Sequence, residues 1–334
     1  MFTRTIFASP NWNSKKLITL FKHNNPLAII LLIVLAVLPE WKSVYALLPE
    51  GNNTAILYNY INQYLFPLHE QSGGLKIINI ILLLAESLFL NKIVSDHRLM
   101  EKPGFVPAMT FLLLQSLLPY SINTFFLLIN GLLIILIKLM ILVYKQEKPS
   151  NNLIAAGFTA GLLASMNTGY WATYLWLVTA LFIMRPASAK EWLIITLGFL
   201  MPFYFILSWQ YLNDELNLKR FFSDFDILFS IPVYAPVTWV KLIVLVTLPL
   251  IGLWMYSAQI GKMVIQNRKT YLVLFILILV ILGIIMLKFE LASREIMFIL
   301  APASLLVAPI FLSFKKDFIP NLLFFLLIAL SLIR

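Results

Sequence analysis

The stretch SINTFFLLINGLLIILIKLMILVY, residues 121–144, contains one charged residue, Lys138, and is otherwise rich in Leu, Ile and Phe. About 20 apolar residues are enough for an α-helix to cross roughly 30 Å of hydrocarbon. A helix also satisfies its own backbone hydrogen bonds in lipid. This segment therefore predicts a transmembrane helix.

Similar apolar runs recur along the chain. Hydrophobic residues make up 61% and charged residues 12% of the 334 residues, against about 45–50% and about 25% in soluble domains. We expect an all-α polytopic membrane bundle of about eleven transmembrane helices. Their expected limits are 26–39, 75–94, 105–118, 121–144, 153–166, 170–184, 192–212, 239–258, 270–288, 296–312 and 318–333.

This composition excludes several classes of protein. A soluble enzyme, a disordered chain and a nucleic-acid-binding domain all need more charged surface than these residues supply. The chain has no Cys, which rules out disulfides, thiol nucleophiles and Cys-ligated metals. In a membrane protein, a net charge of +10 can reflect the excess of Lys and Arg in cytoplasmic loops that sets its orientation.

The cations sort to one side of the expected bundle. With the N-terminus in the cytoplasm, 16 Lys and Arg residues fall on inner segments and 8 on outer ones. Cytoplasmic loops of membrane proteins carry such an excess. We therefore expect a multi-pass protein of a bacterial inner membrane with a cytoplasmic N-terminus, and no nucleic-acid partner.

The expected organisation is a basic amphipathic segment, residues 1–25, followed by a single transmembrane domain, residues 26–334. The segment is expected to lie along the inner leaflet. Two outer loops, about 40–74 and 213–238, are long and contain amphipathic stretches that suit the membrane surface. The hairpins 105–144 and 153–184 fit either full spans or re-entrant segments.

The second hairpin carries small residues at helical spacing. Gly157 and Gly161 lie beside a row of alanines, a pattern typical of closely packed membrane helices. A helix over 153–166 is about 21 Å long and would stop below the outer surface. Two interpretations stay open, an outward hollow above the hairpin and a close-packed helix pair without a cavity.

The order of long and short loops resembles the conserved module of the GT-C glycosyltransferases, over roughly residues 26–258. The stretches Ala155–Gly157, Ala160–Ser165 and Trp192–Leu207, with Gly198-Phe199-Leu200-Met201-Pro202, are similar to the middle helices of that superfamily. Residues 105–212 also resemble an uncharacterised family of multi-pass Bacteroidota proteins. The GT-C resemblance implies a membrane enzyme that acts on polyprenyl-phosphate-linked sugars.

In the GT-C pattern an acid just after the first span acts as base or holds a metal. Glu40 occupies that position, so the resemblance implies that it is the catalytic residue. The chain departs from the pattern in one respect, because its first outer loop contains no Asp. An interfacial Glu beside Lys42 is the structural alternative.

Two further charged groups lie in outer segments. Asp224 and Asp226 match the two-carboxylate pattern that holds a divalent metal in many sugar transferases, although alternate residues diverge on a helix. A solvated face of a surface helix is the alternative. Lys288, Glu290 and Arg294 cluster near another outer exit, where Arg294 suits a bidentate contact to a lipid phosphate. Local pairing of Arg294 with Glu290 is the competing interpretation.

Glu86 and Lys138 are the two charges well inside the expected hydrocarbon. Intramembrane charges are costly and are usually paired or functional. Both lie a similar distance from the cytoplasmic ends of their spans, about eight and six residues. The sequence therefore predicts an ion pair, with a proton or ion path as the alternative.

Three hypotheses for function follow. The first is a GT-C-like protein that transfers or handles polyprenyl-phosphate-linked sugars at the periplasmic face. The second is a non-catalytic membrane subunit or scaffold of a cell-envelope machinery, with other membrane proteins as partners, and the third is a transporter or flippase. The first predicts Glu40 and Arg294 side chains within about 15 Å of each other, a separation that fits one sugar-phosphate between charge-assisted contacts.

Overall fold

The structure is a computed structural model. It describes residues 17–23, 25–42, 73–101, 103–118, 124–144, 146–166, 168–186, 188–214, 236–257, 261, 263–288, 296–314 and 317–333. Throughout these ranges the ordered elements are helices joined by turns, and no strand occurs in them. The protein is therefore all-α over its described part, as predicted.

The helices follow the apolar runs of the sequence. Each of the eleven expected segments overlaps one of the helices α2 and α4–α13. The helices are α1 (Leu17–Lys22), α2 (Pro26–Lys42), α4 (Gly73–Asp96), α5 (Val106–Ser116), α6 (Thr124–Leu142), α7 (Ser150–Met166), α8 (Ala172–Met184), α9 (Ala189–Leu212), α10 (Pro236–Ser257), α11 (Ile265–Lys288), α12 (Met297–Ser313) and α13 (Phe318–Leu332), with the 3₁₀ turn η2 (Thr168–Trp171).

Helices α4, α6, α9, α10 and α11 are long and apolar enough to cross a membrane. On α9 the large apolar side chains of Leu193, Leu197 and Phe205 are each at least 60% exposed, which is costly in water and favourable in lipid. Helices α2, α5, α8, α12 and α13 are apolar but shorter. The chain is a multi-pass membrane protein.

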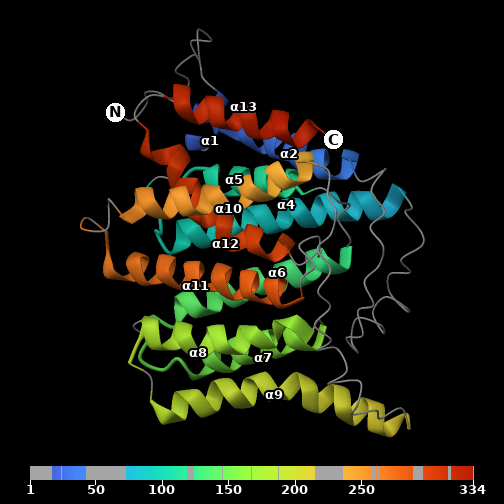
Figure 1. Ribbon diagram of the computed structural model, residues 1–334. Coiled ribbons are helices and arrows are strands. Elements are labelled where there is room, and N and C mark those ends of the chain that lie inside the picture. Colours follow the sequence, from blue (N-terminus) through green and yellow to red (C-terminus); the bar gives the residue numbers. More distant parts are fainter. Residues whose placement is uncertain are drawn as a thin grey trace, which may run out of the picture.

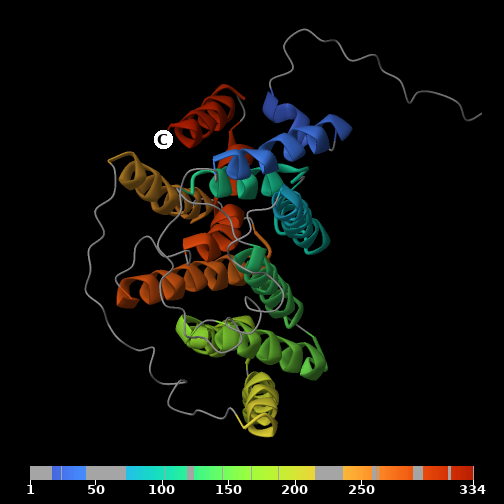
Figure 2. The ribbon, with the colours of Figure 1, turned by 90° about the vertical axis from the view of Figure 1, so that its right-hand side faces the viewer.

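The helices are stacked side by side, with their axes running roughly across the view in Figure 1. Helix α9 forms one edge of the stack, and α1, α2 and α13 form the opposite edge, in both Figure 1 and Figure 2. Two short helices, α5 and α12, lie in the interior of the bundle and pack against each other. All 11 residues of α5 are buried, so this helix is surrounded by the other helices.

Polar contacts tie one end of the bundle, here called the near end, where α2 begins. Lys22 Nζ lies 2.9 Å from Asp317 Oδ1, which joins α1 to the start of α13. Asn267 Nδ2 donates to the carbonyl oxygen of Arg98 at 3.0 Å, joining α11 to the end of α4. Lys269 Nζ donates to the carbonyl oxygen of Met184 at 3.0 Å, joining α11 to the end of α8.

The opposite end of the bundle, the far end, is where α2 ends. Lys241 Nζ, near the start of α10, donates to the carbonyl oxygen of Ile333 after α13 at 2.7 Å. Thr124 Oγ1 donates to Asn79 Oδ1 at 2.6 Å, which joins the first turn of α6 to the second turn of α4. Successive helices therefore alternate in direction between the two ends.

Helix α1 belongs to the bundle. Ile18 and Phe21 are fully buried, and the backbone N–H of Ile18 donates to Asn321 Oδ1 at 3.1 Å. The Phe21 and Phe324 rings lie 6.1 Å apart. This part of the segment expected along the inner leaflet is thus packed against α13. Residues 1–16 lie outside the described residues.

The small residues of α7 pack against α9. A Cβ atom on Gly161 would lie 2.2 Å from the carbonyl oxygen of Phe199, and one on Gly157 would lie 2.4 Å from that of Ile195. On α9, a Cβ atom on Gly198 would lie 2.6 Å from the carbonyl oxygen of Ile154 on α7. The predicted close packing is present, and its partner is α9.

Candidate functional site

The residues expected to form an outer site fall mostly outside the described part of the chain. The residues outside it are Asp224, Asp226, Glu290 and Arg294. The predicted distance between the side chains of Arg294 and Glu40 is therefore also outside the described residues. Glu40 belongs to the last turn of α2, and Lys288 is the last residue of α11. Only the backbones of these two residues are described.

The helix ends nevertheless bring these segments to one end of the bundle. Helices α2, α9 and α11 end at the far end, and α4, α10 and α12 begin there. Glu40, the Asp224–Asp226 segment and the Glu290–Arg294 segment are therefore all attached to far-end helix termini. This follows from helix directions alone.

A polar seam runs between α4 and α6. On α4, Asn79 and Glu86 are seven residues apart, and on α6, Thr124, Gly131 and Lys138 follow at the same spacing. Residues seven apart lie on nearly the same face of a helix. We call Asn79, Glu86, Thr124, Asn130 and Lys138 the α4–α6 seam.

Glu86 occupies the middle of the seam. Its side chain is 7% exposed, and Oε2 accepts a hydrogen bond from Asn130 Nδ2 at 2.7 Å. A Cβ atom on Gly131 would lie 3.4 Å from Glu86 Oε1, an ordinary van der Waals distance, so the carboxyl group lies directly beside this part of α6. Asn130 Oδ1 is buried without a hydrogen-bond partner. The pair thus retains an unused acceptor.

The expected Glu86–Lys138 ion pair does not occur among the ion pairs of the described residues. Lys138 Nζ instead lies over the Phe89 ring, 5.2 Å from its centroid. The physical reason is that Lys138 lies at a different depth along α6 from the residue that contacts Glu86. Asn130, which contacts Glu86, precedes Lys138 by eight residues, or about 12 Å along a helix.

Lys138 also affects a titratable group at the near end. Burial lowers the pKa of His97 below its usual value of 6.5, the negative charge of Asp96 opposes this, and the positive charge of Lys138 adds to it. His97 follows the last residue of α4, beyond the apolar span. Lys138 is therefore electrostatically coupled to His97.

Helix α5 carries a second polar group toward the far end. Gln115, near the end of α5, is fully buried, and neither its Oε1 nor its Nε2 atom has a hydrogen-bond partner. Buried polar groups in proteins are normally hydrogen-bonded. This amide is thus an unsatisfied polar group in the interior of the bundle.

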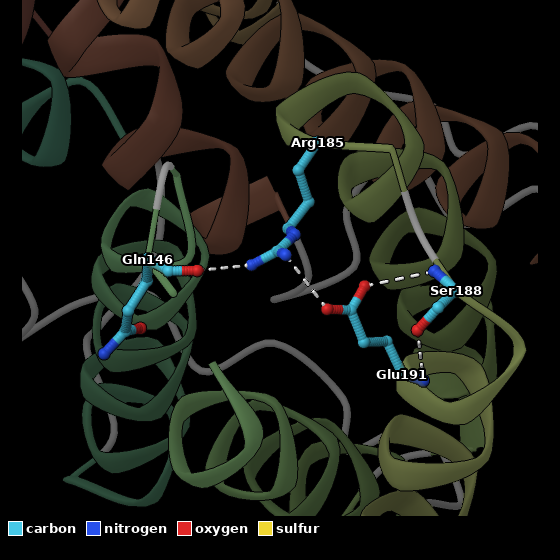
Figure 3. Close-up of polar contacts among 4 residues, drawn as sticks. All are labelled: Gln146, Arg185, Ser188 and Glu191. Carbon is cyan, nitrogen blue, oxygen red and sulfur yellow. Dashed lines mark hydrogen bonds and ion pairs between the residues drawn. The ribbon is translucent and has the colours of Figure 1, made fainter. Parts of the chain in front are cut away.

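A cluster at the near end fixes the start of α9, as Figure 3 shows. Arg185 Nη2 lies 3.2 Å from Glu191 Oε1, and Nη1 donates to the carbonyl oxygen of Gln146 at 2.7 Å. Ser188 and Glu191 form a reciprocal capping box. Sequence reasoning missed this cluster, although the Ser-x-x-Glu pattern before an apolar run is a readable helix-start signal.

Among the described residues, no group of three or more His, Asp or Glu side chains is placed to hold a metal ion. Comparison of the chain with protein-family models, curated proteins and solved structures found no match. The site is therefore interpreted from its own chemistry.

Proposed function

We propose that this protein is a GT-C-like protein of a bacterial inner membrane, with about eleven spans, that transfers or handles polyprenyl-phosphate-linked sugars at its far, periplasmic end. One observation carries the proposal. The segments bearing Glu40, Asp224–Asp226 and Glu290–Arg294 all join helix termini at the same end of the bundle.

The proposed roles follow from the chemistry of transfer. The oxygen of an acceptor hydroxyl attacks the anomeric carbon of the sugar. The bond between that carbon and the phosphate oxygen breaks, and polyprenyl phosphate leaves with the electron pair. Glu40 takes the hydroxyl proton, and Arg294, with Lys288 beside it, neutralises the leaving phosphate. Asp224 and Asp226 are the proposed ligands if a divalent metal assists.

Binding of the lipid is the first test. Purified protein is mixed with a polyprenyl phosphate, and retention is measured by native mass spectrometry. We expect Arg294→Gln to weaken retention about tenfold, the loss expected for one charge-assisted contact. Lys190→Gln removes an exposed cation at the near end and should leave retention unchanged.

Transfer is the second test. A labelled sugar on polyprenyl phosphate should be consumed by the wild type, and Glu40→Gln should abolish consumption while lipid binding persists. Wild-type protein that retains the lipid without turnover would support the scaffold hypothesis. Absence of lipid retention by the wild type would overturn the proposal.

A second candidate function has its own observation, the Glu86–Asn130 pair. A buried carboxyl group with no ion pair among the described residues and a free amide oxygen beside it offers oxygen ligands to a proton or a monovalent cation. Intramembrane acids commonly serve such pathways. This arrangement supports the transporter hypothesis.

A hydrophobic carbodiimide, which modifies protonated carboxyl groups within lipid, tests the second candidate. Intact-mass measurement should show one adduct that is lost in Glu86→Gln and retained in Glu147→Gln, which alters an exposed near-end acid. Sodium or alkaline pH should slow the modification. An adduct insensitive to Glu86→Gln would refute a reactive carboxyl at this position.

A further inference from the structure

A cavity of about 660 Å³ opens at the near end, between the end of α1, the second half of α4 and the turn before α5. Its size lies within the range of small-molecule sites, about 300–1,000 Å³. Its ionisable lining residues are Lys22, His23, Lys92 and Asp96. None of these belongs to the α4–α6 seam or to the proposed far-end site.

One wall of the cavity is held by backbone contacts. The N–H of Phe105 donates to the carbonyl oxygen of Phe21 at 2.7 Å. Gly104 has a φ of +55°, and a Cβ atom there would lie 2.1 Å from the same oxygen. Only glycine permits both the backbone angle and this approach. The turn before α5 is therefore fixed against α1.

The other wall shows a gradient of polarity along α4. Leu88 lies deepest in the span, Asn91 and Lys92 follow about one turn later, and Asp96 is the last residue of the helix. Eight residues of helix extend about 12 Å. Moving outward, the wall therefore changes from apolar to cationic to acidic.

The charges of the lining are not equivalent. Lys22 is already paired with Asp317 at 2.9 Å. Lys92 and Asp96 are exposed to the cavity side of α4 and take part in no ion pair among the described residues. Asn91 Oδ1 is buried without a hydrogen-bond partner. Among the described residues, the cavity thus offers one cation and one anion without an ion pair, and one unused acceptor.

We propose that this cavity binds the headgroup of a phospholipid that carries a primary ammonium group. Lys92, with His23 opposite, contacts the phosphate, as basic pockets between membrane helices do. Asp96 accepts hydrogen bonds from the ammonium group. Leu88 and Phe105 contact the start of an acyl chain.

The headgroup chemistry is tested with defined lipids. Purified protein is exchanged into nanodiscs that contain equal parts of phosphatidylethanolamine, phosphatidylglycerol and phosphatidylcholine, and co-purifying lipid is quantified by mass spectrometry. We expect severalfold enrichment of phosphatidylethanolamine over phosphatidylcholine, because a trimethylammonium group donates no conventional hydrogen bond. Equal retention of the three lipids by the wild type would overturn the proposal.

Variants assign the groups. Lys92→Gln should lower retention of phosphatidylethanolamine about tenfold, and Asp96→Asn should remove the preference over phosphatidylcholine. Lys148→Gln removes an exposed near-end cation outside the cavity and should change neither. An equal effect of Lys148→Gln and Lys92→Gln would contradict a specific site. The wild-type lipid series decides the matter even where a variant fails to fold.

Soluble competitors separate a lipid site from an anion site. Glycerophosphoethanolamine should displace the bound lipid, whereas inorganic phosphate at the same concentration should not. Equal displacement by inorganic phosphate would show a simple anion site and would overturn the lipid assignment.

Discussion

A single buried carboxyl group shows how this protein accommodates polarity in its interior. Glu86 Oε2 receives a hydrogen bond from Asn130 at 2.7 Å, and Oε1 lies beside Gly131. Hydrogen bonds between membrane helices stabilise by about 0.6 kcal/mol on average and up to about 1.7 kcal/mol. The contact therefore makes α4–α6 packing specific at modest energetic gain.

A double-mutant cycle measures this contact. We expect Glu86→Met and Asn130→Leu to be coupled by about 1 kcal/mol in the free energy of unfolding in detergent, because either change alone removes the same hydrogen bond. The cycle of Glu86→Met with Lys138→Met should be additive within about 0.5 kcal/mol. Coupling between Glu86 and Lys138 without coupling between Glu86 and Asn130 would instead support the ion pair predicted from sequence.

His97 should make stability depend on pH. Because burial lowers the pKa of the folded protein's His97 below 6.5, the unfolded chain binds more protons just below that pH. Stability should therefore fall as pH decreases through about 6.5. The His97→Asn variant should lose part of this decline in thermal-unfolding scans between about pH 7 and pH 5. An unchanged slope would contradict the inference.

At the scale of elements, contacts between backbones decide which helices pair. Gly157 and Gly161 of α7 meet Gly198 of α9 so closely that a Cβ atom at any of the three would lie within 2.6 Å of a carbonyl oxygen. Membrane helices associate through such close van der Waals packing, since lipid supplies no hydrophobic force between them. The α7–α9 pair is thus sensitive to a single methyl group.

Gly161→Ala should lower the free energy of unfolding by about 1–3 kcal/mol, because the neighbouring backbone of α9 must shift to admit the Cβ atom. Thermal or chemical unfolding in detergent measures the loss. Gly283→Ala is the matched control, since nothing lies within 4 Å of its Cβ position on α11. Alanine there should be neutral or slightly stabilising. Equal losses in both variants would rule out the close-packing explanation.

At the scale of the whole molecule, the helices alternate between two chemically different ends. The near end is tied by Lys22–Asp317, Arg185–Glu191 and contacts of Asn267 and Lys269. The excess of cations predicted for cytoplasmic segments belongs to this end. We therefore predict that the near end, with its cavity, faces the cytoplasm and that the far end, with the proposed sugar-lipid site, faces the periplasm.

Cysteine labelling tests the orientation without interference, because the chain has no Cys. Lys148 and Asp214 are exposed at the near and far ends. In intact cells, an impermeant thiol reagent should label Asp214→Cys and spare Lys148→Cys until the membrane is opened. The reverse pattern would place the near end outside. Labelling of both from one side would require α7–α9 to cross an even number of times.

The positions of the helices could be predicted from sequence because length and apolarity are local properties. Every expected span overlaps a helix, and the small residues of α7 correctly indicated close packing. The site was less predictable. Depth along two spans suggested Glu86 and Lys138 as partners, whereas the relative positions of α4 and α6 brought Asn130 to Glu86 instead.

The sequence by itself determined that this is an all-α, multi-pass membrane protein, because its residues cannot build a water-soluble surface and its apolar runs match the bilayer. The tertiary structure alone decided that α5 lies in the interior, that α7 packs on α9 and that a charged cavity opens beside α1. The physical reason is that these helices are apolar on all sides, so periodicity gives no facing direction. Contacts among helices supply it.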